Sequence, residues 1–116
     1  QVSKSEFTNC SDKAISCGEI SNIRIRDCKI SYSYFGIVSK DLSLVDTENT
    51  YFSNNFYDFG IYKKKDEYGV GKLIEHNNSG ILNILVDEFS NYSNDKKKVK
   101  IIKINNLEIK NNDNIF

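Results

Sequence analysis

The stretch that decides the fold is GIVSKDLS, residues 36–43, because AISCGEIS at residues 14–21 has the same pattern 22 positions earlier. The correspondence continues for ten more residues, with apolar positions spaced eight and then seven residues apart in both copies. These positions are Ile15, Ile23 and Ile30 in the first copy and Ile37, Val45 and Phe52 in the second. A fixed period of this length indicates a solenoid in which each repeat forms one turn.

The apolar clusters are about three residues long, too short for a helix and typical of strands that alternate inward and outward. Three strands per turn predict an all-β fold, a right-handed parallel β-helix whose turns pair backbone to backbone. We expect about three turns. In the third, Gly60-Ile61-Tyr62 should stack on Gly36-Ile37-Val38 at an offset of 24, followed by an insertion at 63–71. The three core stacks would then continue through Ile61, Ile74 and Ile81.

A leucine-rich repeat is the competing solenoid, because residues 20–30 match its apolar spacing and its period range includes 22. The next copy, residues 42–52, loses two of the apolar positions. This alternative would also place Gly36-Ile37-Val38 in a helical or irregular segment, where a glycine and two β-branched residues fit poorly. The matches therefore favour the β-helix.

The two ends of the chain differ. Residues 1–83 are predicted to form the turns, and residues 84–116 a C-terminal β cap, either a hairpin or a small sheet, because apolar residues alternate near 82–86 and 100–104. The segment from Gln1 to Phe7 is short and polar. We therefore expect an open first turn that stacks on further turns, another domain or another subunit.

Composition argues against several classes of function. The 16 basic residues balance the 16 acidic ones, whereas a nucleic-acid partner normally requires a strongly basic face. No apolar run approaches the ~20 residues of a membrane span. Three cysteines without a Cys-x-x-Cys spacing, together with a single histidine, predict no metal site and no cofactor. The cysteines are expected to be buried thiols, and a disulfide is possible if the protein is exported.

Charged residues collect at one corner of successive turns. Glu19 is level with Asp41, and Gly18 with Lys40, so stacking brings these side chains and the lysine-rich insertion to one edge, about 4.8 Å apart per turn. The predicted ligand-binding edge consists of Glu19, Lys40, Asp41, Tyr62, Lys64, Lys65, Glu67 and Tyr68. The simpler interpretation is a ladder of ion pairs that sets the register, each exposed pair adding ~0.2–1 kcal/mol.

Three segments carry a resemblance to known proteins: DKAISCGEIS at 12–21, FGIVSKDLS at 35–43 and GIYKKKDEYG at 60–69. They resemble right-handed β-helix segments of bacterial proteins, found beside spore-coat-kinase-like (CotH-type) domains or in cell-surface polysaccharide contexts. The resemblance covers about half of the chain and is more specific for fold than for activity. It implies a polysaccharide or a neighbouring domain as partner, and a place at the cell surface or outside the cell.

The expected function is that of a noncatalytic, rigid module that presents or binds polysaccharide or supports a partner domain. Two alternatives remain open. A polysaccharide lyase or hydrolase could use Glu19 and Asp41 as paired carboxylates, or Lys40 as a base. A trimeric adhesin or fibre tip could stack further copies on the open first turn. We expect Phe35, Phe56, Phe59 and Phe89 to pack in the core or at corners rather than to recognise a ligand.

Overall fold

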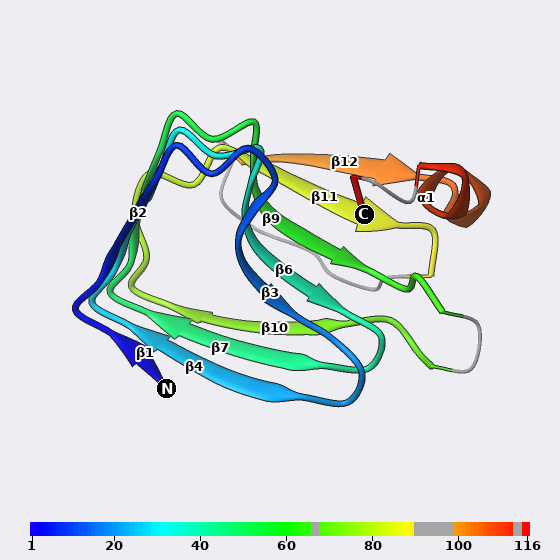
Figure 1. The fold of residues 1–116 in the computed structure, drawn as a ribbon, viewed down its shortest axis with the longest axis horizontal. Coiled ribbons are helices and arrows are strands. Elements are labelled where there is room, and N and C mark those ends of the chain that lie inside the picture. The colour runs from blue at the N-terminus through cyan, green and yellow to red at the C-terminus, as the bar shows by residue number, and fades with distance from the viewer. Residues whose placement is uncertain (66–67, 90–98, 113–114) are drawn as a thin grey trace.

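The computed structural model describes residues 1–65, 68–89, 99–112 and 115–116. The chain winds into a β-solenoid of about 4 turns, with three parallel sheets as its walls (Figure 1). The first wall consists of β1 (Val2–Ser3), β4 (Asn22–Arg26), β7 (Leu44–Glu48) and β10 (Lys72–His76). The second consists of β2 (Glu6–Thr8), β5 (Lys29–Ser31) and β8 (Tyr51–Ser53). The third consists of β3 (Lys13–Cys17), β6 (Phe35–Lys40), β9 (Tyr57–Tyr62), β11 (Asn83–Asp87) and β12 (Lys100–Ile104).

This architecture confirms the all-β parallel solenoid that the 22-residue period predicted. The segment around Gly36-Ile37-Val38, which a leucine-rich repeat would make helical or irregular, is strand β6, which lies between β3 and β9 in the third wall. The leucine-rich alternative is therefore wrong. The side chains that point inward fill the solenoid, and Ile25, Ile30, Ile37, Val45 and Phe52 are completely buried there.

The register of the third turn differs from the prediction. Ile37 lies opposite Phe59, at an offset of 22, whereas Gly60 pairs with Val38. The expected offset of 24 was wrong because the two glycines are not equivalent. A Cβ on Gly36 would lie 2.5 Å from the Asp58 carbonyl oxygen, and one on Gly60 would lie 2.8 Å from the Phe35 ring. Each position therefore needs a glycine because a different neighbouring group leaves no room for a side chain.

The core stack of the first wall also differs by one residue from the prediction. Leu73 continues the stack of Ile23 and Val45, while Ile74 pairs with Asp46 and is 42% exposed. The insertion between β9 and β10 hides the register, and two adjacent apolar residues give no signal for which one points inward. Ile81 is buried in the core, but the bridge between Tyr51 and Ser79 places it one residue beyond the position level with Phe52. The predicted stack of Ile81 on Phe52 was therefore wrong by one residue.

The N-terminal residues form a turn of their own, so the structure has about 4 turns where three were expected. Val2 pairs with Ile25 in the first wall, and Phe7 pairs with Ile30 in the second. Both side chains pack against the core. The strands β1 and β2 are only two and three residues long, too short to show an alternating pattern.

The C-terminal end is not a β-hairpin. Strand β12 pairs parallel with β11, and β11 pairs parallel with β9, so both strands extend the third wall. Helix α1 (Asn106–Asn111) follows, and its first turn is capped by the Asn105 side chain, which accepts a hydrogen bond from the Leu107 amide. The boundary between residues 83 and 84 stays a prediction.

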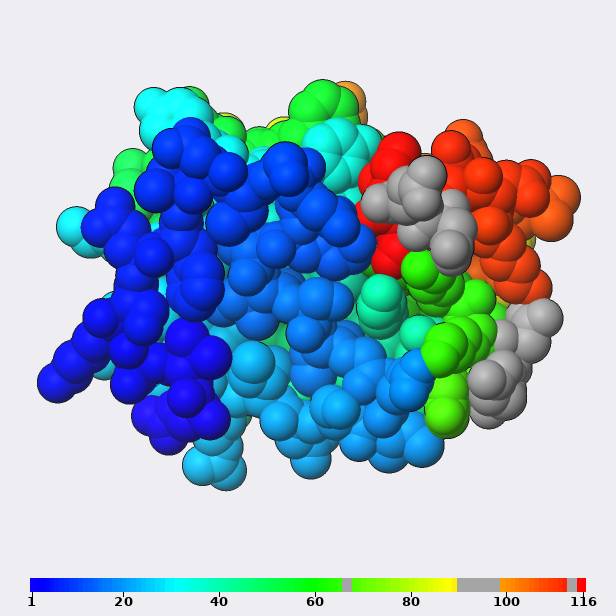
Figure 2. All heavy atoms as spheres, in the orientation of Figure 1, coloured from blue at the N-terminus to red at the C-terminus, as the bar shows by residue number. Residues whose placement is uncertain are grey.

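The helix and the last two residues cover the outer face of the third wall. Ile109 and Phe116 are buried against side chains on that face, namely Phe35, Val38, Tyr62 and Leu85. Figure 2 shows the C-terminal residues, in red, lying against the turns near the N-terminus. In this way the third wall separates two apolar clusters, one inside the solenoid and one outside it.

Left-handed backbone conformations mark the corners and repeat from turn to turn. The corner between the first and second walls has one such residue in each turn, at Lys4, Asp27, Asn49 and Asn77. The corner between the third and first walls has two in succession, at Glu19–Ile20 and again at Asp41–Leu42. Asparagine tolerates this conformation better than most residues, which fits its abundance of 15 in the chain.

Candidate functional site

The predicted charged edge lies at the corner where the third wall turns into the first. Strand β3 ends before Glu19, β6 ends at Lys40, and β9 ends before the loop 63–71. The corners stack through backbone hydrogen bonds, because the Ile20 amide donates to the Asp41 carbonyl and the Leu42 amide donates to the Gly69 carbonyl. Three successive turns therefore bring their corner residues side by side.

Five predicted residues line one shallow hollow at this corner. The hollow has a volume of about 500 Å³ and is lined by Gly18, Glu19, Ser21, Lys40, Asp41, Lys64 and Lys65. We call it the lysine hollow. Three of the lining side chains are lysines and two are carboxylates, so the cations outnumber the anions by one.

Asp41 is buried and has a structural role. The residue is only 1% exposed. Its Oδ1 atom accepts hydrogen bonds from the backbone amides of Lys64 and Lys65, both at 2.8 Å. These bonds hold the beginning of the loop against the corner of the preceding turn. The carboxylate thus positions the backbone of Lys64 and Lys65, two of the three lysines of the hollow.

Glu19 and Lys65 form an ion pair across two turns at the surface. The hydrogen bond and the charge of Lys65 lower the pKa of Glu19, and Lys40 contributes to the same shift. Both side chains are about half exposed. An exposed pair of this kind contributes little to stability.

Lys40 is half-buried at the hollow. Burial lowers its pKa, and the neighbouring charges of Lys64 and Lys13 act in the same direction. Its Nζ atom donates to the Phe116 carbonyl oxygen at 3.0 Å. The carboxylates of Asp41 and Asp12 act in the opposite direction, so burial is the main reason that the pKa of Lys40 is lowered.

The remaining predicted residues are placed differently. Tyr62 is fully buried on the outer face of the third wall, where its hydroxyl donates to the Phe116 carbonyl oxygen at 3.1 Å. The Tyr62 side chain is therefore not exposed at the predicted ligand-binding edge. Tyr68 is half-buried, and its amide donates to the Lys65 carbonyl. Glu67 lies outside the described residues.

The sequence did not predict that the carbonyl oxygens of Ile115 and Phe116 accept hydrogen bonds from side chains near the hollow. The Lys13 ammonium donates to the Ile115 carbonyl oxygen at 2.7 Å, and Lys40 and Tyr62 both donate to Phe116. Contacts across 54 to 102 residues leave no periodic signal, because the C-terminal residues lie outside the repeat.

The described residues contain no group of three or more histidine, cysteine or acidic side chains arranged to hold a metal ion. Cys10, Cys17 and Cys28 are free thiols, and burial raises the pKa of Cys17. Across the described part of the chain, no helix combines the length and the apolar character needed to cross a membrane.

Comparison with protein-family models, with curated proteins and with solved structures gave no match. The chemistry of the lysine hollow is accordingly argued from its residues. Three ammonium groups, one exposed carboxylate and the Ser21 hydroxyl can make ion pairs and hydrogen bonds to a ligand that carries both carboxylate and hydroxyl groups.

Proposed function

We propose that this chain is a noncatalytic β-solenoid module that binds an acidic polysaccharide in the lysine hollow. The proposal is carried by the convergence of Lys40, Lys64 and Lys65 around one hollow on a rigid corner. The Asp41 carboxylate fixes the backbone of the two loop lysines, so their ammonium groups start from an ordered main chain. Uronic-acid units supply the matching carboxylates and hydroxyls.

The same geometry argues against a pair of catalytic carboxylates. Asp41 is buried and already accepts two backbone amides, whereas a general acid or base must reach the substrate. Glu19 is exposed and has a lowered pKa, while a general acid needs a raised one. Lys40 is the remaining candidate for a lyase base, and product formation tests that role directly.

The test is a binding experiment with acidic and neutral oligosaccharides of equal length, in which new reducing ends and unsaturated products are recorded in parallel. The Lys64→Ala/Lys65→Ala double variant should weaken binding of the acidic oligosaccharide about tenfold or more. Lys103→Ala is the matched control, because Lys103 is an exposed lysine on β12 that does not line the hollow. The control should bind as the wild type does.

Glu19→Gln separates binding from catalysis. Removing this carboxylate removes a charge that competes with the ligand for Lys65, so a binding site should gain affinity. A catalytic carboxylate would instead lose all turnover. Cleavage products from the wild type that disappear in Glu19→Gln or Lys40→Ala would overturn the noncatalytic proposal in favour of a lyase or hydrolase.

A second function is favoured by the N-terminal end of the solenoid. Within the described residues, β1, β2 and β3 each have a neighbour on one side only, and Val2 and Phe7 are half-buried at that end. An unpaired parallel edge over an apolar core can accept a further turn. We propose that this end stacks on a neighbouring domain or on another copy, as in an adhesin or fibre tip. The neighbour implied by the resemblance is a spore-coat-kinase-like domain, and a cell-surface or extracellular place stays a prediction.

Sedimentation of the purified chain over a wide range of concentrations tests self-stacking. If copies associate through this end, Phe7→Lys should yield monomers, because a charge would enter the contact. Leu107→Lys, an exposed apolar residue on α1, serves as the control and should leave association unchanged. A wild-type chain that is monomeric throughout would contradict an oligomeric role.

A further inference from the structure

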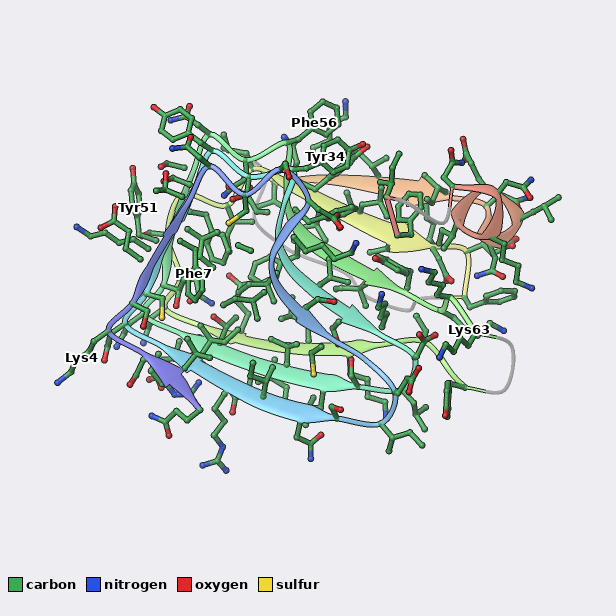
Figure 3. The ribbon with its side chains drawn as sticks, in the orientation of Figure 1. Lys4, Phe7, Tyr34, Tyr51, Phe56 and Lys63 are labelled. Carbon is green, nitrogen blue, oxygen red and sulfur yellow. The ribbon has the colours of Figure 1, made fainter. Side chains whose placement is uncertain are left out.

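A pair of aromatic rings lies at the corner between the second and third walls, away from the lysine hollow. The rings of Tyr34 and Phe56 stack with their centroids 5.0 Å apart and their planes 5° apart. They occupy equivalent positions in successive turns, 22 residues apart. Figure 3 shows both side chains together at this corner. Phe56 is 60% exposed, although a ring at a corner was expected to be packed.

The orientation of the Phe56 ring is fixed by its neighbours. Tyr34 covers one face, and the Tyr57 ring meets Phe56 edge-on at 4.8 Å and 79°. Tyr57 in turn stacks against the buried Phe35 ring. The exposed ring is therefore held by packed side chains and does not have to be ordered when a ligand arrives.

A hollow of about 650 Å³ adjoins Phe56. It is lined by Asn55, Phe56, Tyr57, Asn83, Lys100, Ile101 and Ile102. We call it the Phe56 hollow. Four of its lining residues belong to β11 and β12, whereas Tyr34 precedes β6 on the opposite side of β9, so the hollow and Tyr34 lie on different sides of Phe56. A third ring placed here would extend the stack of two.

The polar groups of this hollow lie beside the aromatic surface. Asn55 is occupied, because its amide nitrogen donates to Ile30 and Asp58 and its oxygen accepts from the Ser33 amide. Asn83 donates to the Phe56 carbonyl oxygen at the exposed rim, and Lys100 is exposed on β12. An apolar platform with an amide and an ammonium group at its edge suits a ring that has apolar faces and a polar perimeter.

We propose that the Phe56 hollow binds one pyranose unit of a neutral saccharide, with a C–H face of the sugar against Phe56 and its hydroxyls toward Asn83 and Lys100. A sugar is favoured over a nucleobase because a single lysine adjoins the ring, whereas binding of nucleic acid requires a basic groove for the phosphates. The inference stands apart from the acidic-polysaccharide proposal. The two hollows lie at opposite ends of β9, about 17 Å apart along the strand at a rise of about 3.3 Å per residue.

The experiment uses saturation-transfer NMR and isotherms with neutral hexose oligosaccharides on the whole chain. Phe56→Ala should reduce affinity about tenfold or more, and Phe56→Tyr should stay within about threefold of the wild type, because it keeps the ring. Phe89→Ala is the matched control, since Phe89 is a phenylalanine that is 51% exposed, against 60% for Phe56, and does not line the hollow. The control should bind as the wild type does.

Thermal unfolding of each variant is measured in parallel, because Phe56 also contacts Tyr34. If Phe56→Ala fails to fold, Lys100→Ala takes its place and should lower affinity about threefold or more. Equal binding by the wild type and Phe56→Ala would overturn the proposal. Stronger binding of single-stranded oligonucleotides than of any saccharide, or no binding of a saccharide at millimolar concentration, would overturn it too. Loss of acidic-oligosaccharide binding in the Lys64→Ala/Lys65→Ala variant bears only on the other hollow.

Discussion

At the scale of single residues, buried aspartates tie the turns together where the chain leaves the strand ladders. Asp41 accepts the amides of Lys64 and Lys65, and Asp58 accepts the Leu82 amide at 2.7 Å. Asp87 accepts the Lys63 amide at 3.0 Å. Each carboxylate satisfies backbone donors that no strand pairs, and this is why these residues are buried despite their charge.

Asp41→Ala should destabilise the protein by about 1–3 kcal/mol, because two partly buried amides lose their acceptor. Glu6→Ala removes an exposed carboxylate from the edge strand β2 and should change stability by less than about 0.5 kcal/mol. Urea unfolding of both variants measures the difference. Equal stability of the two variants would show that the hydrogen bonds accepted by Asp41 do not stabilise the fold.

Tyr62 should make the protein sensitive to alkaline pH. Burial raises the pKa of Tyr62 above the ordinary value of 10.0, so the folded protein holds this proton more tightly than the unfolded chain does. The resulting stability is complete below pH 10 and is lost as the pH rises further, because the unfolded chain then ionises. Denaturant unfolding between pH 8 and 11 should show a smaller loss in Tyr62→Phe than in the wild type. An equal loss in both would contradict the assignment.

At the scale of elements, the sequence predicted strands where the repeat is regular. Ile15, Ile37 and the stack of Ile30 on Phe52 follow directly from the 22-residue period. Helix α1 gave no such signal, because it is six residues long and buries one apolar residue, Ile109, against a wall formed by distant strands. The register after the loop 63–71 was equally out of reach, since the insertion interrupts the period.

Gly71 fixes the passage from the loop into β10. A Cβ at this position would lie 2.0 Å from the Ser39 carbonyl oxygen, which belongs to the neighbouring strand β6. Gly71→Ala should therefore destabilise the protein by about 1–3 kcal/mol. Gly18→Ala is the control, because its nearest contact is the flexible Lys40 side chain at 3.4 Å. Thermal unfolding compares them, and a Gly71→Ala variant as stable as the control would mean that the close approach is wrong.

Helix α1 should contribute to stability through its apolar contact with the third wall. Ile109 is completely buried on the outer face of the third wall, whereas Leu107 in the same helix is 63% exposed. Ile109→Ala should cost about 2–5 kcal/mol, and Leu107→Ala less than about 0.5 kcal/mol. Similar unfolding midpoints for the two variants would show that the helix does not pack on the wall in solution.

At the scale of the whole molecule, the solenoid is a stiff support that brings corners of successive turns into line. This is why the charged edge was predictable: the stacked corners bring Glu19, Lys40, Asp41, Lys64 and Lys65 to one hollow. Tyr62 was misplaced because its inward or outward direction depends on the register of the third turn and on a C-terminal cover that no repeat encodes. The exposure of Phe56 was also missed, since nothing in the period shows where a corner stays uncovered.

The rigid corner that holds the lysine hollow is proposed to bind an acidic saccharide. The most direct measurement is a map of backbone amide shifts in the NMR spectrum during titration with a uronic-acid oligosaccharide. The shifts should saturate, should concentrate on Gly18, Glu19, Lys40, Lys64 and Lys65, and should vanish in the Lys64→Ala/Lys65→Ala variant. An unchanged spectrum at millimolar ligand, or shifts confined to other corners, would contradict it.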